Sequence, residues 1–430
     1  MSSRGDARRP ARPQPRRIAV VGAGLAGLRT VAALRDSGFG GEISVLGAEG
    51  LAPYDRPPLT GELFTRTEPA WLADEIGSNV FDLADQVDLA SPARTIAPAA
   101  TRKGVVRLDA GGDDEVFADV AVVACGSHAV LPPDWEAATL HTAPDAAALR
   151  ERLSPGSHLI CVGAGWIGSE VASAAAAAGC RVTVLEAAPA PLAGPLGRAV
   201  GGLTIPWYEA GGVELNLGAR VSAVGPDHVH LADGRRLDAD VVLAAVGARP
   251  STDWLDDRLA LTPRRAVATD RGGLADGARG GFQPGTVYAV GDCADRTTEH
   301  HGVVAGGHWA SALHDPGLVA LSILQVPLPE QDPAPYVFSQ QHGHELALFG
   351  QPTPAHRVVF RGDPRAGGPW SALYVEPPRS GTEAALAAGL AVDAPRDVAA
   401  LRRLLAGPRP TLDLVRAAKA SLPLRDAVVA

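Results

Sequence analysis

Two glycine-rich segments carry the residue pattern that binds the pyrophosphate of a dinucleotide. Both place three glycines at the same spacing after an apolar strand: Gly22, Gly24 and Gly27 in IAVVGAGLAGL, and Gly163, Gly165 and Gly168 in HLICVGAGWIG. The first glycine permits a tight turn, the second lets the backbone approach the pyrophosphate, and the third lets helix and strand pack closely. The N-terminus of the following helix adds unpaired N–H groups and a positive dipole. Each segment therefore predicts one nucleotide site.

An acidic residue follows each fingerprint at about the distance where the adenosine ribose is recognised. Glu49 follows the strand ISVLG, and Glu186 ends the strand RVTVLE. A carboxylate there accepts a hydrogen bond from the 2′-OH of NAD and repels the 2′-phosphate of NADP. Ala187 and Ala188 supply no arginine that would compensate. The second site is therefore predicted to prefer NADH.

Each fingerprint is followed later in the chain by an apolar strand that ends in glycine. FADVAVVACG ends at Gly126, and LDADVVLAAVG ends at Gly247. A third strand, GTVYAVGDC, ends at Gly291 and Asp292, where a carboxylate can accept a hydrogen bond from a polyol chain. One GxGxxG alone is weak evidence, but two copies within strand, helix, strand and acid indicate tandem dinucleotide-binding domains. The third strand indicates that one of the two sites holds a flavin.

These elements predict an α/β protein with two tandem Rossmann-like domains and a C-terminal α+β interface domain. We expect a disordered tail over 1–15, a discontinuous first domain over 16–127 and 248–329, a second domain over 128–247, and the C-terminal domain over 330–430. In the last of these, PYVFSQQHGHELALFG alternates like strands, whereas APRDVAALRRLLAG and TLDLVRAAKASL have helical patterns.

Composition and charge exclude several classes. The 430 residues are 46% hydrophobic and 20% charged, as in a folded globular protein. Residues 1–17 carry six Arg and one acid, Asp6, and so have a net charge of +5. Because the whole chain has a net charge of −9, the remaining residues carry −14. This balance argues against a nucleic-acid partner. No stretch approaches the roughly 20 apolar residues that cross a bilayer, so we expect no membrane association and a cytoplasmic location.

Cysteine and histidine spacing argues against metal and dithiol chemistry. Cys125, Cys161, Cys180 and Cys293 form no CxxC pair and lie in or beside apolar segments, so we expect small buried hydrophobes rather than a redox dithiol or a zinc site. We interpret His300, His301 and His308 as exposed loop histidines, and we expect no metal.

The order of several longer motifs resembles a known family. The motifs are GAGLAG, PYDRPPL (53–59), GAGWIGSEVA (163–172), AVGARPSTDWL (245–255), YAVGDCA (288–294) and HWASA (308–312). They resemble the bacterial FAD-dependent ferredoxin reductases of the putidaredoxin and rubredoxin reductase type, within the pyridine nucleotide-disulfide oxidoreductase superfamily and its glutathione-reductase-like fold. The similarity runs from about Arg17 to Lys419.

This resemblance implies FAD in the first domain and NADH in the second. It implies hydride transfer from NADH to FAD, then single electrons to a [2Fe-2S] ferredoxin that serves a cytochrome P450 or an oxygenase, in a monomer or homodimer. It also implies a set of cofactor-binding residues: Gly22, Gly24, Leu25, Ala26, Gly27, Glu49, Arg56, Gly126, His128, Gly163, Gly165, Ile167, Gly168, Glu186, Gly247, Gly291, Asp292 and Trp309.

Two of the implied positions are catalytic. Glu170 resembles the family acid near the nicotinamide, and Trp309 would lie near the isoalloxazine. The alternatives are a helix acid stabilised by the dipole for Glu170 and a core tryptophan for Trp309. At the FAD ribose, the usual family acid aligns with Ala48, next to Glu49.

The chain also departs from the family pattern near the predicted flavin. Gly61 replaces a lysine, His128 an arginine, Gly307 a glutamate, Ser311 an asparagine and Gln340 an aspartate. The segment 296–312 also carries fewer arginines than usual, and the Arg-rich tail is a possible tether for an acidic ferredoxin. Two alternatives therefore stay open: a flavoenzyme of the same fold that acts directly on a small molecule, and a redox-silent protein that kept the folds.

Overall fold

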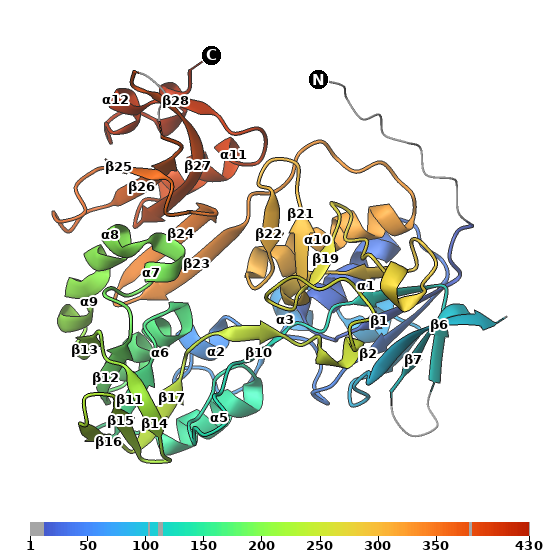
Figure 1. Ribbon diagram of the computed structural model, residues 1–430, viewed down its shortest axis with the longest axis horizontal. Coiled ribbons are helices and arrows are strands. Elements are labelled where there is room, and N and C mark those ends of the chain that lie inside the picture. Colours follow the sequence, from blue (N-terminus) through green and yellow to red (C-terminus); the bar gives the residue numbers. More distant parts are fainter. Residues whose placement is uncertain (1–12, 102–103, 111–114, 378–380, 430) are drawn as a thin grey trace.

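The computed structural model describes residues 13–101, 104–110, 115–377 and 381–429. Most of the predicted tail, residues 1–12, lies outside these ranges. The described chain builds two parallel sheets flanked by helices and one large antiparallel sheet near the C-terminus (Figure 1). The predicted fold class is confirmed, whereas the exact domain boundaries stay a prediction.

The first parallel sheet has the strand order β20-β9-β1-β2-β5. Its strands are β1 (Arg17–Val21), β2 (Glu42–Leu46), β5 (Gln86–Asp88), β9 (Val120–Val123) and β20 (Val287–Ala289). Helices α1 (Leu25–Asp36) and α10 (Trp309–Ile323) pack together on one face. The other face meets β6 (Thr95–Thr101), β7 (Gly104–Asp109) and β8 (Glu115–Ala118). Strand β20 pairs with β9 although the whole second nucleotide unit separates them in sequence.

The second parallel sheet has the order β13-β12-β11-β17. Its strands are β11 (His158–Val162), β12 (Arg181–Glu186), β13 (Val213–Leu217) and β17 (Val241–Ala244). Helix α6 (Trp166–Ala177) packs on one face. A three-stranded antiparallel sheet of β14 (Val221–Val224), β15 (His228–Leu231) and β16 (Arg236–Asp238) packs on the other. Strands β11 and β17 are buried along their full length, as expected for a sheet covered on both faces.

The C-terminal sheet is antiparallel and has the order β23-β24-β27-β26-β25. Its strands are β23 (Tyr336–Gln341), β24 (His344–Gly350), β25 (Arg357–Arg361), β26 (Trp370–Val375) and β27 (Glu383–Val392), and α11 (Pro395–Leu404) covers it. The helix predicted over TLDLVRAAKASL is wrong in its first turn. Residues Thr411–Asp413 form strand β28, which pairs with β27, and only Leu414–Ala417 form the short helix α12.

The hairpin β23-β24 docks the C-terminal sheet against the second nucleotide unit. At its turn the backbone N–H of His342 donates to Ser173 Oγ of α6 at 2.8 Å. The ring of His344 stacks on Trp207 with centroids 4.1 Å apart. Farther along, Tyr374 Oη donates to the carbonyl of Leu196 at 2.8 Å. These contacts fasten the C-terminal sheet to α6 and to two later positions of the second nucleotide unit, Leu196 and Trp207 (Figure 1).

Shorter elements connect these sheets. The helices among them are α2 (Pro58–Gly61), α3 (Leu72–Glu75), α4 (Val80–Leu83), α5 (Ala143–Arg152), α7 (Ala193–Leu196), α8 (Arg198–Gly201) and α9 (Ile205–Ala210). The strands are β3 (Tyr54–Asp55), β4 (Ala70–Trp71), β10 (Ser127–Ala129), β18 (Ala248–Pro250), β19 (Val267–Thr269), β21 (Ala294–Thr297) and β22 (Val303–Ala305). Among the described helices, none combines the length and the apolar character needed to span a bilayer.

Candidate active site

The first glycine fingerprint lies between β1 and α1 and leaves one open approach to the helix N-terminus. Gly22 has φ +118°, and a Cβ there would lie 2.1 Å from the carbonyl oxygen of Ala124. A Cβ on Gly27 would lie 1.9 Å from the carbonyl oxygen of Gly22. A Cβ on Gly24 would meet nothing within 4 Å. Two glycines are therefore required by chain packing, and the third keeps space free where a pyrophosphate would approach.

The second fingerprint repeats this division of roles between β11 and α6. Gly163 has φ +108° and faces the carbonyl oxygen of Ala245, and Gly168 packs on the carbonyl oxygen of Gly163. A Cβ on Gly165 would again meet nothing within 4 Å. The two loops therefore present the same cradle at two helix N-termini.

Strand register brings the predicted landmarks of each sheet to one edge. In the first sheet Val123 is the register partner of both Val21 and Ala289. The residues that follow these three strands include Gly22, Gly126 and Gly291, and all three glycines have positive φ. The carboxyl ends of parallel strands are where ligands bind in open α/β sheets. The strands of the second sheet also end at one edge, because Val162 is the register partner of both Leu185 and Ala244.

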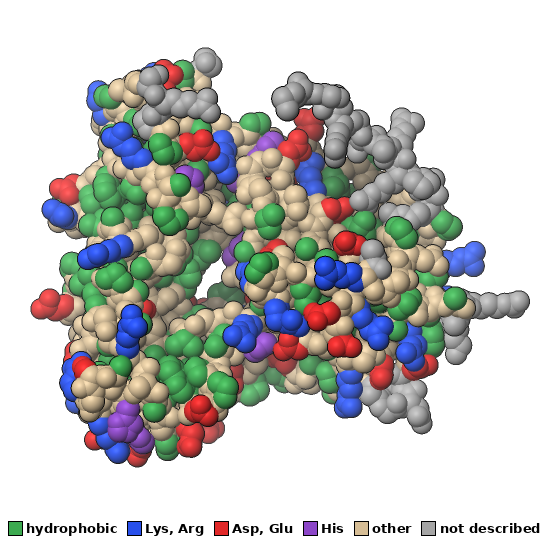
Figure 2. Space-filling view, viewed as in Figure 1, with side chains coloured by type: hydrophobic (Ala, Val, Ile, Leu, Met, Phe, Trp, Pro, Cys, Tyr) green, Lys and Arg blue, Asp and Glu red, His purple; other side chains and the backbone are tan. Residues whose placement is uncertain are grey.

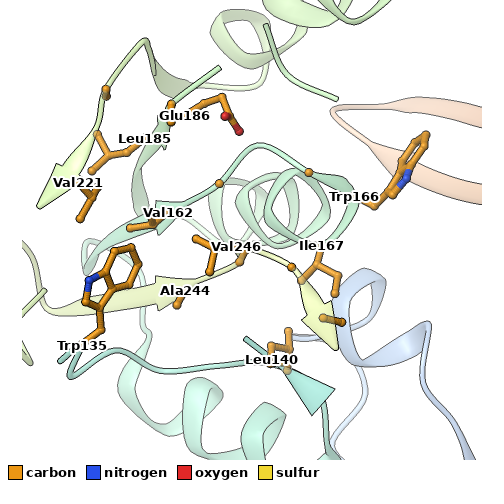
Figure 3. Close-up of a pocket in the computed structure, with 18 of the residues that line it drawn as sticks. Trp135, Leu140, Val162, Trp166, Ile167, Leu185, Glu186, Val221, Ala244 and Val246 are labelled. Atoms are coloured by element: carbon orange, nitrogen blue, oxygen red, sulfur yellow. The ribbon is translucent and has the colours of Figure 1, made fainter. Parts of the chain in front are cut away.

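A pocket of about 780 Å³ opens at this edge of the second sheet (Figure 3). Five residues predicted to bind NADH line it: Gly163, Gly165, Ile167, Glu186 and Gly247. Gly168 is absent from the lining because it is buried between helix and strand. Most of the remaining lining is apolar, with one acid at the end of β12. This donor set fits a dinucleotide, whose rings need apolar surface and whose ribose needs a carboxylate.

Glu186 is held rigidly at the rim of the pocket. Its Oε2 accepts a hydrogen bond from the backbone N–H of Ala164, and its Oε1 accepts one from Ala188, each at 2.7 Å. A carboxylate has about four acceptor positions, so two remain for ribose hydroxyls. The fold thus orients the predicted specificity residue through its own backbone.

Sequence reasoning missed two residues that line the same pocket. Arg220, between β13 and β14, supplies a cation near Glu186, although Ala187 and Ala188 supply none. Trp135, in the connection between the two nucleotide units, adds an indole ring. Both lie more than 30 residues from Glu186 along the chain, so no local motif signals them.

Glu170 lies where three parts of the chain meet. Thr60 Oγ1 of α2 donates to its Oε2 at 2.6 Å, and Ser339 Oγ of β23 donates to its Oε1 at 2.5 Å. Burial raises the pKa of the Glu170 carboxyl, although the two hydroxyl hydrogen bonds act in the opposite direction. Among the described residues no cation forms an ion pair with it. It is the fifth residue of α6, and the first turn of that helix holds no acid, so the helix-dipole alternative has little support.

Trp309 begins α10 and is hydrogen-bonded across the first nucleotide unit. Its Nε1 donates to Asp55 Oδ1 at 2.9 Å, although 254 residues separate the two. Burial raises the pKa of Asp55, and the Trp309 hydrogen bond lowers it. The indole is only partly buried, which differs from a core tryptophan.

The third predicted strand places Asp292 beside the first nucleotide sheet. Ser127 Oγ donates to Asp292 Oδ2 at 2.9 Å. Gly291 faces Ala26, because a Cβ on Gly291 would lie 2.8 Å from the Ala26 Cβ. His128 is exposed, and its Nδ1 is hydrogen-bonded with Ser251 Oγ at 3.1 Å. The residues predicted for the FAD ribityl side and the fingerprint therefore adjoin each other at one sheet edge.

Glu49 and Arg56 are brought together by the loop that carries PYDRPPL. The Arg56 guanidinium forms an ion pair with the Glu49 carboxylate and also donates to the carbonyl of His141. Tyr54 Oη donates to Glu49 Oε2 at 2.6 Å, and burial raises the Tyr54 pKa to about 12. Leu25 starts α1 directly after Gly24. The role of Glu49 at a ribose stays a prediction.

The space-filling surface is hollowed near its centre (Figure 2). In Figure 1, α6, β10, β22 and β23 surround this region. In this view, elements from both nucleotide units and from the C-terminal sheet therefore border one depression.

Three of the predicted departures from the family have visible structural settings. A Cβ on Gly61 would meet nothing within 4 Å, so the missing lysine leaves open space beside Thr60. Gly307 has φ +101°, a conformation that a glutamate would adopt only with strain. Gln340 is exposed and donates to Glu345 at 3.3 Å.

The interpretation of three exposed loop histidines is wrong. His301 is only 6% exposed, and its ring is hydrogen-bonded with the carbonyl of Leu405 at 2.8 Å. His308 caps α10, because its Nδ1 accepts from the Ser311 N–H at 3.1 Å, and burial lowers its pKa to about 4. His300 is partly buried. The C-terminal sheet and α10 cover this segment, which its loop-like sequence did not reveal. Within the described residues, no group of three or more His, Cys, Asp or Glu is arranged to hold a metal.

The fold also brings together two cysteines that sequence spacing kept apart. The two thiols are close enough for Cys293 to raise the pKa of Cys125, and Cys125 Sγ donates to the carbonyl of Ser251 at 3.1 Å. Cys161, Cys180 and Cys293 are buried, as predicted, whereas Cys125 is only partly buried. All four are free thiols.

Comparison with known proteins agrees with this arrangement. Residues 16–308 match the model of the pyridine nucleotide-disulphide oxidoreductase family, and residues 336–428 match the reductase C-terminal family. The ferredoxin reductase component of chlorobenzene dioxygenase from Cupriavidus sp. (strain PS12) is 32% identical, over 96% of this chain and 97% of that protein. Terpredoxin reductase from a Pseudomonas species is 30% identical, over 95% and 97%.

A solved structure shares the fold along nearly the whole chain. The crystal structure of a protein named Fdr9 has a TM-score of 0.82 at 34% identity and covers 95% of this chain and 99% of its own. With both family models matched in order and the relatives aligned along nearly their full length, the chain belongs to the pyridine nucleotide-disulphide oxidoreductases, in the branch that carries the reductase C-terminal domain.

Proposed function

We propose that this protein is an NADH-dependent ferredoxin reductase that serves a cytochrome P450 or an oxygenase. With both cofactors bound, NADH supplies a hydride to FAD, and the reduced flavin releases electrons one at a time to a [2Fe-2S] ferredoxin. One observation carries the proposal: Glu170, on the helix that begins with the NADH fingerprint, is hydrogen-bonded to Thr60 of the FAD unit. This contact supports the inference that the two nucleotide sites adjoin each other there.

Residues of this chain divide the work of binding and orientation. Gly24 and Gly165 keep space for the two pyrophosphates, and Glu186 accepts the ribose hydroxyls of NADH. Glu170 lies where a nicotinamide and a flavin would meet, with its carboxyl fixed by Thr60 and Ser339. The other cofactor-binding roles are those predicted above, including Asp292 toward the ribityl side and Trp309 near the ring.

Electrons would leave the flavin directly rather than through a dithiol. Cys293 is buried, and Cys125 is partly buried and donates to the backbone of Ser251. The named functions of the relatives support an iron–sulfur protein as the acceptor, because they are ferredoxin reductase components of oxygenase systems. Because the reaction draws on NADH, we expect it in the cytoplasm.

An anaerobic titration of the purified protein tests this function. We expect a visible flavin spectrum that bleaches with one equivalent of NADH and returns when an oxidised [2Fe-2S] ferredoxin is added. A flavin that NADH reduces but no ferredoxin reoxidises would overturn the proposed acceptor and favour a small-molecule substrate. A flavin that NADH does not reduce would overturn the reductase activity itself.

A further inference from the structure

The pocket at the second fingerprint extends well beyond the residues that the fingerprint explains. Figure 3 shows Ile167 and Leu140 toward one end, Trp135 and Val221 toward the other, and Glu186 above them. A pyrophosphate belongs at the helix N-terminus, and the acid after the second strand contacts the ribose of the adenosine half. The end that holds Trp135 and Val221 therefore remains for the adenine ring.

Trp135 offers the largest ring surface at this end. It is partly buried and packs with Val221 against the core between the second sheet and its antiparallel cover. Among the described residues, its indole N–H has no hydrogen-bond partner, so packing alone fixes the ring. Stacking of a nucleobase on an aromatic side chain changes binding by roughly 5- to 150-fold per base.

Arg220 supplies the only lysine or arginine in the pocket lining. Its backbone is fixed, because its carbonyl accepts the N–H of Ala232 at 2.8 Å. Its side chain is exposed, and within the described part of the chain the guanidinium has no hydrogen-bond or ion-pair partner. A guanidinium stacks on aromatic faces and pairs with phosphate oxygens. An unengaged cation beside Glu186 is therefore available to the adenosine half of a ligand.

We propose that Trp135 and Arg220 form the adenine-binding end of the NADH pocket. Trp135 provides the stacking surface for the adenine, and Arg220 provides the cation that holds this half of the molecule. Arg220 also sets how strongly the site rejects a 2′-phosphate, because its charge opposes that of Glu186. This inference rests on the proposed use of NADH and names the residues that give it adenosine affinity.

Binding of nucleotide fragments to the oxidised, FAD-loaded protein tests the inference without turnover. The probes are ADP-ribose, which contains the adenine, nicotinamide mononucleotide, which lacks it, and 2′,5′-ADP, which adds a 2′-phosphate. Isothermal titration gives their dissociation constants for wild type, Trp135→Ala, Trp135→Phe and Arg220→Ala. Trp207→Phe and Arg236→Ala are matched controls, because neither residue lines the pocket.

We expect Trp135→Ala to weaken ADP-ribose binding by about tenfold and to leave nicotinamide mononucleotide unchanged. Trp135→Phe keeps an aromatic ring, and its affinity for ADP-ribose should fall by only about two- to threefold. Arg220→Ala should weaken 2′,5′-ADP more than ADP-ribose. The controls should bind all three probes as wild type does.

The inference would be overturned if wild type and Trp135→Ala bound ADP-ribose equally well. It would also be overturned if Trp135→Ala lost the same affinity for nicotinamide mononucleotide as for ADP-ribose. The flavin spectrum and the melting temperature report whether each variant is folded. If Trp135→Ala does not fold, Trp135→Phe and Arg220→Ala still test the inference. If NADH fails to reduce the wild-type flavin while Trp135→Ala still weakens ADP-ribose, the proposed function fails and the adenine site stands.

Discussion

Thr60 Oγ1 donates a hydrogen bond to Glu170 Oε2 at 2.6 Å, across 110 residues of sequence. A second hydroxyl, that of Ser339, donates to the other carboxylate oxygen. Gly61, next to Thr60, is one of the departures from the family pattern noted above, which has a lysine at this position. Two neutral hydroxyl groups therefore hold this buried acid, and no cation among the described residues forms an ion pair with it.

This setting predicts a specific pH dependence of stability. Burial raises the Glu170 pKa above that of the unfolded chain, about 4.3. Between these two values the folded protein holds the extra proton, so stability falls as pH rises. Glu170→Gln removes that loss, and we expect it to be more stable than wild type by about 1–2 kcal/mol at pH 8 and equal to it near pH 4. Urea unfolding at both pH values measures the difference.

The exposed acid Glu209 provides the control for this experiment. Glu209→Gln should follow wild type at every pH, because its side chain is solvated. If Glu170→Gln loses stability equally at pH 4 and pH 8, the carboxyl is not titrating in this window, and the expected raised pKa is wrong.

The two roles of glycine within one fingerprint can be separated by substitution. A Cβ on Gly165 meets open space, whereas one on Gly168 would lie 2.0 Å from the carbonyl oxygen of Gly163. We expect Gly165→Ala to fold normally and bind NADH at least tenfold more weakly, because its Cβ obstructs the pyrophosphate. Gly168→Ala should lower stability by about 1–3 kcal/mol through overpacking.

Melting temperature and the dissociation constant of NAD⁺ distinguish these outcomes. The pair serves as its own control, since both changes add one methyl group to the same glycine fingerprint. A Gly165→Ala protein that binds NAD⁺ like wild type would show that the nucleotide does not approach the backbone there.

Glu186 is expected to control the choice between NADH and NADPH. Replacing Glu186 by Gln keeps an acceptor oxygen for only one of the two backbone N–H groups, those of Ala164 and Ala188, and removes the negative charge. The ratio of kcat/KM for NADPH to that for NADH should rise by about tenfold, equivalent to about 1.4 kcal/mol. Initial rates with each nucleotide measure it. A wild-type enzyme that already prefers NADPH would contradict the assignment.

Trp309 and Asp55 should behave as a coupled pair. Trp309→Phe keeps an aromatic ring but removes the N–H that Asp55 accepts. Leaving a partly buried carboxylate with one fewer donor should cost about 1–2 kcal/mol of unfolding free energy. In a double-mutant cycle with Asp55→Ala, which removes the acceptor, the two losses should be less than additive. Strict additivity in chemical denaturation would show that the hydrogen bond contributes nothing to stability.

Local sequence patterns predicted the parts of this fold that depend on neighbouring residues. Strand β1, helix α1 and the turn at Gly22 follow from an apolar run, a helical periodicity and a glycine with positive φ. The helical pattern of TLDLVRAAKASL gave a wrong prediction for its first three residues, because they pair with residues 383–385 of β27, 26 to 30 positions earlier in the chain. Sheet pairing depends on a partner that a local window does not contain.

For the candidate site, local sequence motifs were enough to predict the two glycine cradles, the acid at Glu186 and hence the class of ligands. The cradles act through backbone geometry, and Glu186 lies at a fixed distance along the chain from its cradle. The residues that complete the sites could be identified only from the three-dimensional packing. Thr60 and Ser339 reach Glu170, and Trp135 and Arg220 reach the pocket beside Glu186, from segments far away in sequence. Such contacts follow from the packing of whole sheets and helices, which sets the distances between residues that no motif connects.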